Sequence, residues 1–485
     1  MAAGTAGNPS VPVPARAWRA LGVASAGYSL MSFNTTSTNL AFDELSKTFA
    51  SSSASTLSWV ASVFFIGLAS LLPVSGRIAD RAGRRRVFRV GLLLFAAGSA
   101  LSAVAPWIGV LIAARLVTAA GGAMIVPASL AVILPEFPKE RHMTAVAVWA
   151  STGPLAAAIA PAVSALILAV TSSWRVLFAI SVPVSLAAFA GSFRVLRESR
   201  AERVGGRLDA LGVVLGTLTV AALVYAVGQA PGRGPTAPSV LVAAALFVLC
   251  LPVFLWRCRV HPEPLLNLDV FLLRPVWVAN LGNFLLNLAG QAMWLLWPLF
   301  CSRLWGYSKV QTGLALLPGP ILSGILTSLG GRVSERYGHE VLVRWGPLVH
   351  LVALAWPLLF LTDTPNYLLA AGPAIALSGG GWALTQPPLN SGVLSRVGSD
   401  FYGEVNASFN TVRNVAAALG VAIAVAVVGD PGRPDAFAAY DRAFWTILVF
   451  GAACWLVLLF LYPRRAPGPG TDAGPAQIPP RRSAR

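Results

Sequence analysis

The sequence predicts an all-α protein that crosses a membrane many times, and three observations carry this prediction. Of its 485 residues, 56% are hydrophobic and 11% are charged, and the mean hydropathy is +0.69. This composition leaves too few polar side chains to cover a water-soluble surface. Apolar stretches of about 20 residues, the length at which an α-helix crosses the hydrocarbon, recur along almost the whole chain. Basic side chains gather in alternate connecting segments, as in polytopic membrane proteins.

Hydropathy places fourteen spans along the chain, with boundaries good to a few residues. They are expected at 17–40, 56–76, 87–105, 108–134, 143–170, 174–193, 209–228, 239–256, 276–301, 312–330, 341–361, 367–394, 405–428 and 440–462. The first is too long for the apolar region of a signal peptide, and no convincing cleavage site follows it. We therefore expect it to be retained as a helix.

The topology explains the net positive charge. Lysine and arginine number 36 against 19 acidic residues, a formal charge of +17, which in a soluble protein would raise the question of nucleic acid. Here many arginines fall in two connecting segments, 77–89 and 194–207. The positive-inside rule then places both termini in the cytoplasm. We expect the protein to lie in the cytoplasmic (inner) membrane. Because the topology accounts for the charge, no nucleic acid partner is expected.

An internal repeat divides the chain into two similar halves. The segment GRIADRAG at 76–83 recurs in outline as GRVSERYG at 331–338, an offset of 338 − 83 = 255 residues. Parallel halves of this kind rock around a site near the membrane midplane. In chain order we expect a disordered N-terminal tail (1–16), an N-terminal six-helix half (17–193), a basic loop with two inserted helices and a connecting loop (194–275), a C-terminal six-helix half (276–463) and a disordered basic C-terminal tail (464–485).

The first copy of the repeat, with the arginines at 84–86, resembles the signature loop of the major facilitator superfamily. The pair WR at 174–175 and the run GYS at 306–308 resemble motifs of its fourteen-helix drug:proton antiporter branch. The resemblance implies a major facilitator fold of two six-helix halves plus two inserted helices. It also implies secondary active transport by alternating access, with efflux of small amphipathic molecules or drugs and coupling to protons.

The repeated loop is expected to act as a conformational latch. A carboxylate such as that of Asp80 can accept hydrogen bonds from arginines or a helix N-terminus in one arrangement and release them in another. The alternative, a loop that is merely basic, explains the arginines but not the repeated acid and glycines. The residues assigned to the latch are Gly76, Asp80, Arg81, Gly83, Arg84, Gly331, Glu335, Arg336 and Gly338.

Two departures from the branch bear on proton coupling. Asn34 stands where the branch has an aspartate in the first span, and the glycine pair of the fifth span is replaced after Pro161. No carboxylate lies in the middle of an expected span, although a desolvated carboxylate is the usual coupling site. Asp43 and Glu404, at the ends of spans, are the candidates that remain, while His350 is expected to be a packed, neutral histidine.

Polar side chains recur every three or four residues in the first and ninth spans, which places them on one face of each helix. Equivalent faces of the two halves are expected to line a substrate cavity. The alternative is that these groups hold helices together. Arg115 in the fourth span, unless it reaches the membrane surface, and Arg413 are expected to face the same cavity, because a charge inside the membrane is costly. The residues assigned to the cavity are Ser29, Ser32, Asn34, Thr36, Asn39, Arg115, Asn283, Asn287, Gln291, Trp294 and Arg413.

Other classes of function are disfavoured. The chain has no metal-ligand spacing, nucleophile elbow or phosphate-binding loop, so an enzyme, a metal site and a cofactor are not expected. Two arginines without a midplane carboxylate favour an anionic or neutral amphipathic substrate. The alternatives to a proton-coupled exporter are a facilitator or importer of an anionic or neutral metabolite without protons, and a transport-inactive membrane sensor. The expected partners are a small-molecule substrate, the lipid bilayer and protons, and the protein is expected to be a monomer.

Overall fold

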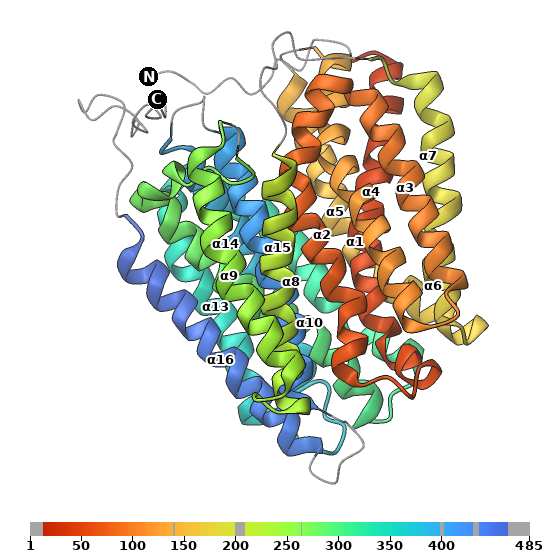
Figure 1. The fold of residues 1–485 in the computed structure, drawn as a ribbon, viewed down its shortest axis with the longest axis vertical. Coiled ribbons are helices and arrows are strands. Elements are labelled where there is room, and N and C mark those ends of the chain that lie inside the picture. The colour runs from red at the N-terminus through yellow and green to blue at the C-terminus, as the bar shows by residue number, and fades with distance from the viewer. Residues whose placement is uncertain are drawn as a thin grey trace. The chain divides into compact units, whose positions relative to one another are not determined.

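The computed structural model describes residues 13–138, 141–198, 209–262, 264–397, 402–429 and 436–463, and these are almost entirely helical (Figure 1). The α-helices are α1 (Ala15–Thr48), α2 (Ala54–Ala82), α3 (Arg84–Val104), α4 (Ile108–Ile133), α5 (His142–Thr171), α6 (Trp174–Ala179), α7 (Ser181–Val195), α8 (Ala210–Arg233), α9 (Pro238–Val260), α10 (Arg274–Arg303), α11 (Lys309–Ala315), α12 (Pro318–Tyr337), α13 (His339–Phe360), α14 (Ala371–Leu394), α15 (Tyr402–Val428) and α16 (Ala436–Leu461). Short 3-10 turns lie at Leu134–Glu136 and Asp269–Leu272.

Twelve segments of the described residues are long and apolar enough to cross a membrane, against the fourteen expected. The two expected spans outside this set are α1 and α14, which have 34 and 24 residues. Length is therefore not the cause. α1 carries a run of amide and hydroxyl side chains at 34–39, and α14 carries three consecutive glycines and three prolines, which lower the hydropathy of both helices.

Two of the twelve spans are each built from a pair of helices. α6 and α7 share the span Trp174–Val195, and α11 and α12 share Lys309–Ser334. Proline explains both breaks, since it has no N–H to donate and clashes with the carbonyl four residues earlier. Pro183 is the third residue of α7, and Pro318 is the first residue of α12.

The chain divides into two compact units, which we describe separately. Unit 1 consists of Met1–Ala41 and Leu71–Gly205, and unit 2 of Phe42–Ser70 and Gly206–Arg485. Unit 1 therefore contains most of α1, the end of α2 and the helices α3 to α7. Unit 2 contains the end of α1, most of α2 and the helices α8 to α16.

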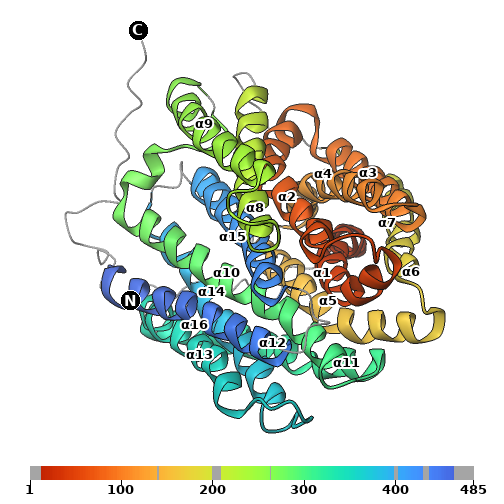
Figure 2. The ribbon, with the colours of Figure 1, turned by 60° about the horizontal axis from the view of Figure 1, so that its bottom comes forward.

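In unit 1 the backbones of α3 and α4 approach closely, and α7 covers α3 on another side (Figures 1 and 2). Glycine makes this approach possible. A Cβ at Gly121 of α4 would clash with the backbone nitrogen of Phe95, and one at Gly91 of α3 would lie 3.0 Å from the carbonyl oxygen of Gly121. These glycines therefore hold the two helices at a separation that larger residues cannot match.

The same arrangement recurs in unit 2 between α13 and α14. A Cβ at Gly381 of α14 would clash with the backbone nitrogen of His350, and one at Gly346 of α13 would lie 2.8 Å from the carbonyl oxygen of Leu384. The repeat offset of 255 relates Gly91 to Gly346, because 91 + 255 = 346, and Phe95 to His350, because 95 + 255 = 350. The similarity of the two repeat copies thus extends from the loop sequence to the packing of the helices that follow each copy.

Candidate functional site

Arg115 of α4 meets Asn34 of α1 inside unit 1. Both residues are 1% exposed, and the guanidinium of Arg115 donates a hydrogen bond to the amide oxygen of Asn34. The ring of Phe178, on α6, lies 5.4 Å from the guanidinium carbon, and an aromatic face at that distance stabilises a cation. The pair therefore carries one positive charge in the interior of a transmembrane helix bundle. A charge is costly there, so Arg115 is a candidate functional residue.

Further polar contacts join α1 to α5. The hydroxyl oxygens of Ser37 and Ser164 lie 2.7 Å apart in the interior, and Ser29 donates a hydrogen bond of 3.3 Å to the carbonyl oxygen of Thr152. The amide of Asn39 is 2% exposed and has no hydrogen-bond partner among the described residues. The other α1 residues assigned to the cavity are half-buried or buried: Ser32 and Thr36.

In unit 2 the amides of α10 form a network with α14 and α15. Asn287 Nδ2 donates to Asn283 Oδ1 at 2.9 Å and to Gln386 Oε1 at 3.0 Å. Gln386 Nε2 donates to Asn283 Oδ1 at 2.9 Å, and Asn283 Nδ2 donates to the carbonyl oxygen of Phe409 at 2.8 Å. These bonds join three helices, which is the role given above as the alternative for this face. The other assigned residues of this unit are half-buried: Gln291, Trp294 and Arg413.

The first repeat loop ends at Gly83, whose φ of +106° lies in the region that favours glycine. α3 begins at the next residue, and the backbone N–H of Arg85 donates to Glu198 Oε1 at 3.0 Å. A carboxylate at a helix N-terminus is stabilised by the helix dipole. Glu198, which follows α7, thus supplies a carboxylate that sequence analysis did not assign to this loop, while the side chain of Asp80 lies outside the described part. The other assigned residues of this copy are half-buried: Gly76, Arg81 and Arg84.

The second copy of the loop is tied to the end of α16 in a related way. Gly338 has a φ of +84°, and the next helix, α13, carries Arg344, which donates to the carbonyl oxygen of Tyr462 at 3.3 Å. In unit 1 the equivalent residue, since 89 + 255 = 344, is Arg89 of α3, which donates to the carbonyl oxygen of Ser192 on α7 at 3.1 Å. Each copy thus precedes a helix whose arginine donates to a backbone carbonyl near the end of a later helix, α7 in unit 1 and α16 in unit 2. The side chain of Glu335 lies outside the described residues, and the remaining assigned residues are exposed: Gly331 and Arg336.

A cluster of opposite charges, which we call the α1-end cluster, joins the end of α1 to α10 and α11 within unit 2. Asp43 pairs with Arg303 at 3.0 Å and with Lys47 at 2.6 Å, and Glu44 pairs with Lys309 at 3.3 Å. The hydrogen bond to Asp43 is the main reason that the pKa of Lys47 lies above its usual value. Of the two residues assigned to proton coupling, Asp43 is therefore in an ion-pair cluster, whereas the side chain of Glu404 lies outside the described part.

His350 packs against α14. It is 2% exposed, and its Nδ1 lies 3.2 Å from the carbonyl oxygen of Ser378. Among the residues described, no three histidine, cysteine, aspartate or glutamate side chains come together where they could hold a metal ion.

Comparison with known proteins gives one family. The sequence model described as Major Facilitator Superfamily matches residues 24–421. The methylenomycin A resistance protein of Bacillus subtilis (strain 168) is 28% identical over 453 residues, covering 93% of this chain and 95% of its own. The multidrug efflux pump LfrA of Mycolicibacterium smegmatis (strain ATCC 700084 / mc(2)155) is 29% identical over 421 residues, covering 86% of this chain and 82% of its own.

Solved structures show the same fold at low sequence identity. A D-xylose-proton symporter superposes with a TM-score of 0.67 at 14% identity, over 92% of this chain and 98% of its own. An auto-inhibited peptide transporter of the POT family superposes with a TM-score of 0.66 at 15% identity, over 95% of this chain and 99% of its own.

Proposed function

Because the chain belongs to the Major Facilitator Superfamily and is a multi-pass membrane transporter, we propose that it exports small amphipathic molecules across the cytoplasmic membrane by alternating access. Relatives that align over most of the chain are named for antibiotic resistance or multidrug efflux, which supports efflux as the direction. The motifs at 174–175 and 306–308 support a place in the fourteen-helix branch.

This proposal includes α1 and α14 among the membrane spans, which makes fourteen. α1 is 34 residues long and α14 is 24, so at 1.5 Å per residue each exceeds the roughly 30 Å of hydrocarbon. An even number of spans places both termini on the same side. The basic segments 77–89 and 194–207 then favour the cytoplasm for that side.

The hydrogen-bonded pair of Arg115 and Asn34 is the observation that carries the proposal. A spanning helix accepts an arginine at a cost of about 2.5–3.5 kcal/mol even by lenient insertion scales. Asn34 accepts a hydrogen bond from Arg115 but does not neutralise its charge, so the pair can attract an anionic or polarised neutral group and repels a cation. We propose that this pair and the polar face of α1 contact the substrate.

Proton coupling is proposed at Asp43, the coupling candidate whose side chain is described. Its ion pairs with Arg303 and Lys47 could exchange for a proton when the α1-end cluster opens. The neutral amide of Asn34 favours the competing proposal, a carrier that moves its substrate without protons. Counterflow that persists after the proton gradient is collapsed would support the carrier.

We predict that Asn34→Asp removes the preference of the transporter for anionic over cationic substrates. The new carboxylate would pair with Arg115 and cancel its charge, so the affinity for an anionic substrate should fall by roughly tenfold while binding of a quaternary ammonium dye improves. Binding of both probes to the purified protein measures this. Asn406→Asp, at an exposed residue of α15, is the matched control, and equal effects of the two changes would contradict the assignment.

The ion pair between Asp43 and Arg303 in the α1-end cluster should affect the rate of transport. We expect Asp43→Arg and Arg303→Asp each to slow transport by about three- to tenfold, because each places two like charges together, and the double change to restore most of the rate. Transport by reconstituted protein measures this, with Arg233→Asp, an exposed charge reversal on α8, as the control. If the double variant is as slow as the product of the single ones, the pair has no role in the cycle.

A further inference from the structure

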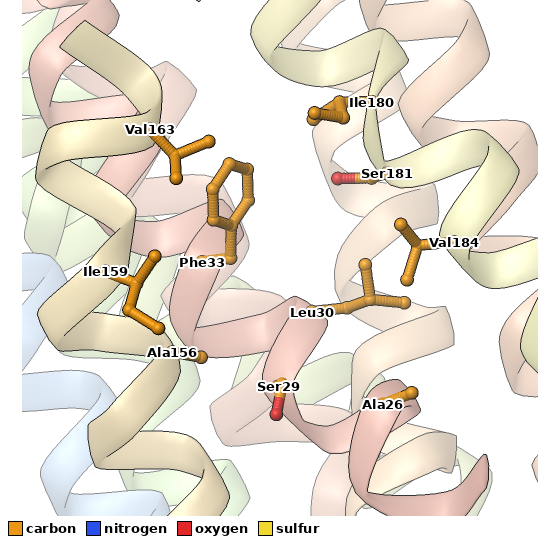
Figure 3. A pocket seen from close by; sticks show the side chains of 10 residues that line it. All are labelled: Ala26, Ser29, Leu30, Phe33, Ala156, Ile159, Val163, Ile180, Ser181 and Val184. Carbon is orange, nitrogen blue, oxygen red and sulfur yellow. The ribbon is translucent and has the colours of Figure 1, made fainter. Parts of the chain in front are cut away.

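Unit 1 contains a cavity that is lined by neither Arg115 nor Asn34. It has a volume of about 280 Å³ and lies between α1, α5 and the α6–α7 span. Figure 3 shows Leu30 and Phe33 of α1 between Ile159 of α5 on one side and Val184 of α7 on the other. The lining also includes two hydroxyl side chains but no charge, so a neutral apolar molecule fits its chemistry. The ten lining residues are Ala26, Ser29, Leu30, Phe33, Ala156, Ile159, Val163, Ile180, Ser181 and Val184.

The cavity lies near the middle of each helix that forms it. Its lining residues fall at 26–33 in α1, 156–163 in α5 and 180–184 in the span Trp174–Val195. At 1.5 Å per residue, none is further than about 10 Å along the axis from the middle of its helix. Since the hydrocarbon extends about 15 Å to each side of the midplane, the cavity lies at the depth of the lipid tails.

Two of the three walls of the cavity, α5 and the α6–α7 span, leave much surface uncovered. In the most apolar 18 residues of the spans Ser151–Thr171 and Trp174–Val195, 35% and 33% are buried, against 50% for Arg84–Val104 and 56% for Ile108–Glu136. Two lining residues are themselves exposed, Ile159 by 49% and Val184 by 40%. A molecule dissolved in the hydrocarbon therefore contacts the same helices that line the cavity.

Ser181 adds a polar group to this apolar lining. Ser181 is fully buried, and its hydroxyl has no hydrogen-bond partner among the described residues. Figure 3 shows this hydroxyl directed toward the cavity. An unpaired hydroxyl in an apolar environment is costly. Pro183, two residues later, has no N–H to donate to the carbonyl oxygen of Ala179. The helix therefore also leaves this backbone acceptor without its usual donor. A ligand with a hydrogen-bond acceptor would satisfy the Ser181 hydroxyl.

We infer that this cavity is a binding site for a small neutral lipophilic molecule that carries one hydrogen-bond acceptor and enters from the hydrocarbon of the membrane. A phospholipid tail fits the apolar wall but not the hydroxyl, because its ester oxygens lie at the edge of the hydrocarbon, about 15 Å from the midplane. The existence of this binding site does not depend on the proposed function. Only the naming of neutral lipophilic compounds as the substrate class that reaches the transporter from the lipid rests on it.

Photolabelling of the full-length protein in lipid nanodiscs tests the inference. The probe is a ten-carbon ketone that carries a diazirine, and the labelled peptides are identified by mass spectrometry. Labelling should concentrate on 26–33, 156–163 and 180–184, and unlabelled 2-decanone should compete for it more strongly than decane does. Even labelling of all lipid-facing helices, or equal competition by decane, would overturn the inference in favour of a lipid tail or of no site.

Two variants separate the shape of the cavity from its hydroxyl. Ala26→Phe fills the cavity and should lower labelling at these segments at least fivefold, whereas Ala187→Phe on the exposed face of α7 should leave it unchanged. Ser181→Ala should weaken competition by 2-decanone about two- to tenfold and leave decane unaffected. Unchanged labelling in Ala26→Phe and unchanged competition in Ser181→Ala would each contradict the site.

A negative result in the binding assay and a negative result in the transport assay are independent of each other. Site-specific labelling in a protein that moves no substrate would overturn the proposed function and leave the binding site intact. Transport of 2-decanone without labelling of these segments would overturn the site and leave the proposed function intact.

Discussion

Arg115→Met is expected to abolish transport while the protein keeps or gains thermal stability. Methionine fills similar space without the charge, so the membrane cost of about 2.5–3.5 kcal/mol disappears, and this offsets the cost of about 1–3 kcal/mol for leaving the buried amide oxygen of Asn34 unpaired. Loss of a charged hydrogen bond to the substrate should weaken binding of an anionic probe by roughly ten- to a hundredfold. Probe binding, flux and the thermal unfolding midpoint should be measured on the same preparation.

The combination of these results distinguishes a functional arginine from a structural one. If Arg115 only held α1 and α4 together, the methionine variant would unfold at a lower temperature and its probe affinity would follow its folded fraction. Arg115→Lys keeps the charge but not the planar fork, and should retain part of the binding. Arg233→Met, at an exposed residue of α8, is the control for loss of an arginine in general.

Gly121→Ala and Gly381→Ala should each destabilise the protein, by about 1–3 kcal/mol for overpacking. At both positions the added Cβ meets backbone atoms of the facing helix, those of Phe95 and His350, and a backbone cannot move aside as a side chain tip can. Gly324→Ala on α12 is the matched control, because nothing lies within 4 Å of a Cβ there, and it should gain up to about 1 kcal/mol from helix propensity.

Thermal unfolding midpoints in detergent check this prediction. Both tightly packed variants should unfold at lower temperature than the parent, and the Gly324 variant at the same or a higher temperature. Equal midpoints for the three variants would show that the close approach of α3 to α4 and of α13 to α14 does not limit stability.

The helical class of the fold and most span positions could be predicted from hydropathy, because a spanning helix is a local property of about 20 consecutive residues. α1 and α14 are helices where two spans were expected, but their polar and glycine residues lower their hydropathy, so their crossing of the membrane stays a prediction. Hydropathy did not detect the breaks between α6 and α7 or between α11 and α12, although Pro183 and Pro318 were a usable signal for both.

The assignment of residues to a substrate site stays a prediction, but some contacts of those residues can be compared with the sequence. Helical periodicity placed Asn283 and Asn287 on one face, but could not show that Gln386 on α14 is their partner. Glu198 was missed for the same reason, since it lies 113 residues from Arg85, and no local pattern connects the two. The repeat offset was the one long-range signal in the sequence, and extending it from Gly338 to Arg344 would have related Arg344 to Arg89 before the structure was known.

Export by protein reconstituted into liposomes, with an interior pH dye and neutral, anionic and cationic amphiphiles as substrates, tests the central claim most directly. The account predicts saturable movement of a neutral or anionic amphiphile that Arg115→Met abolishes, and proton flux in the opposite direction if Asp43 couples the two. Saturable movement of a cation that is insensitive to Arg115→Met, or no movement of any of the three classes, would contradict it.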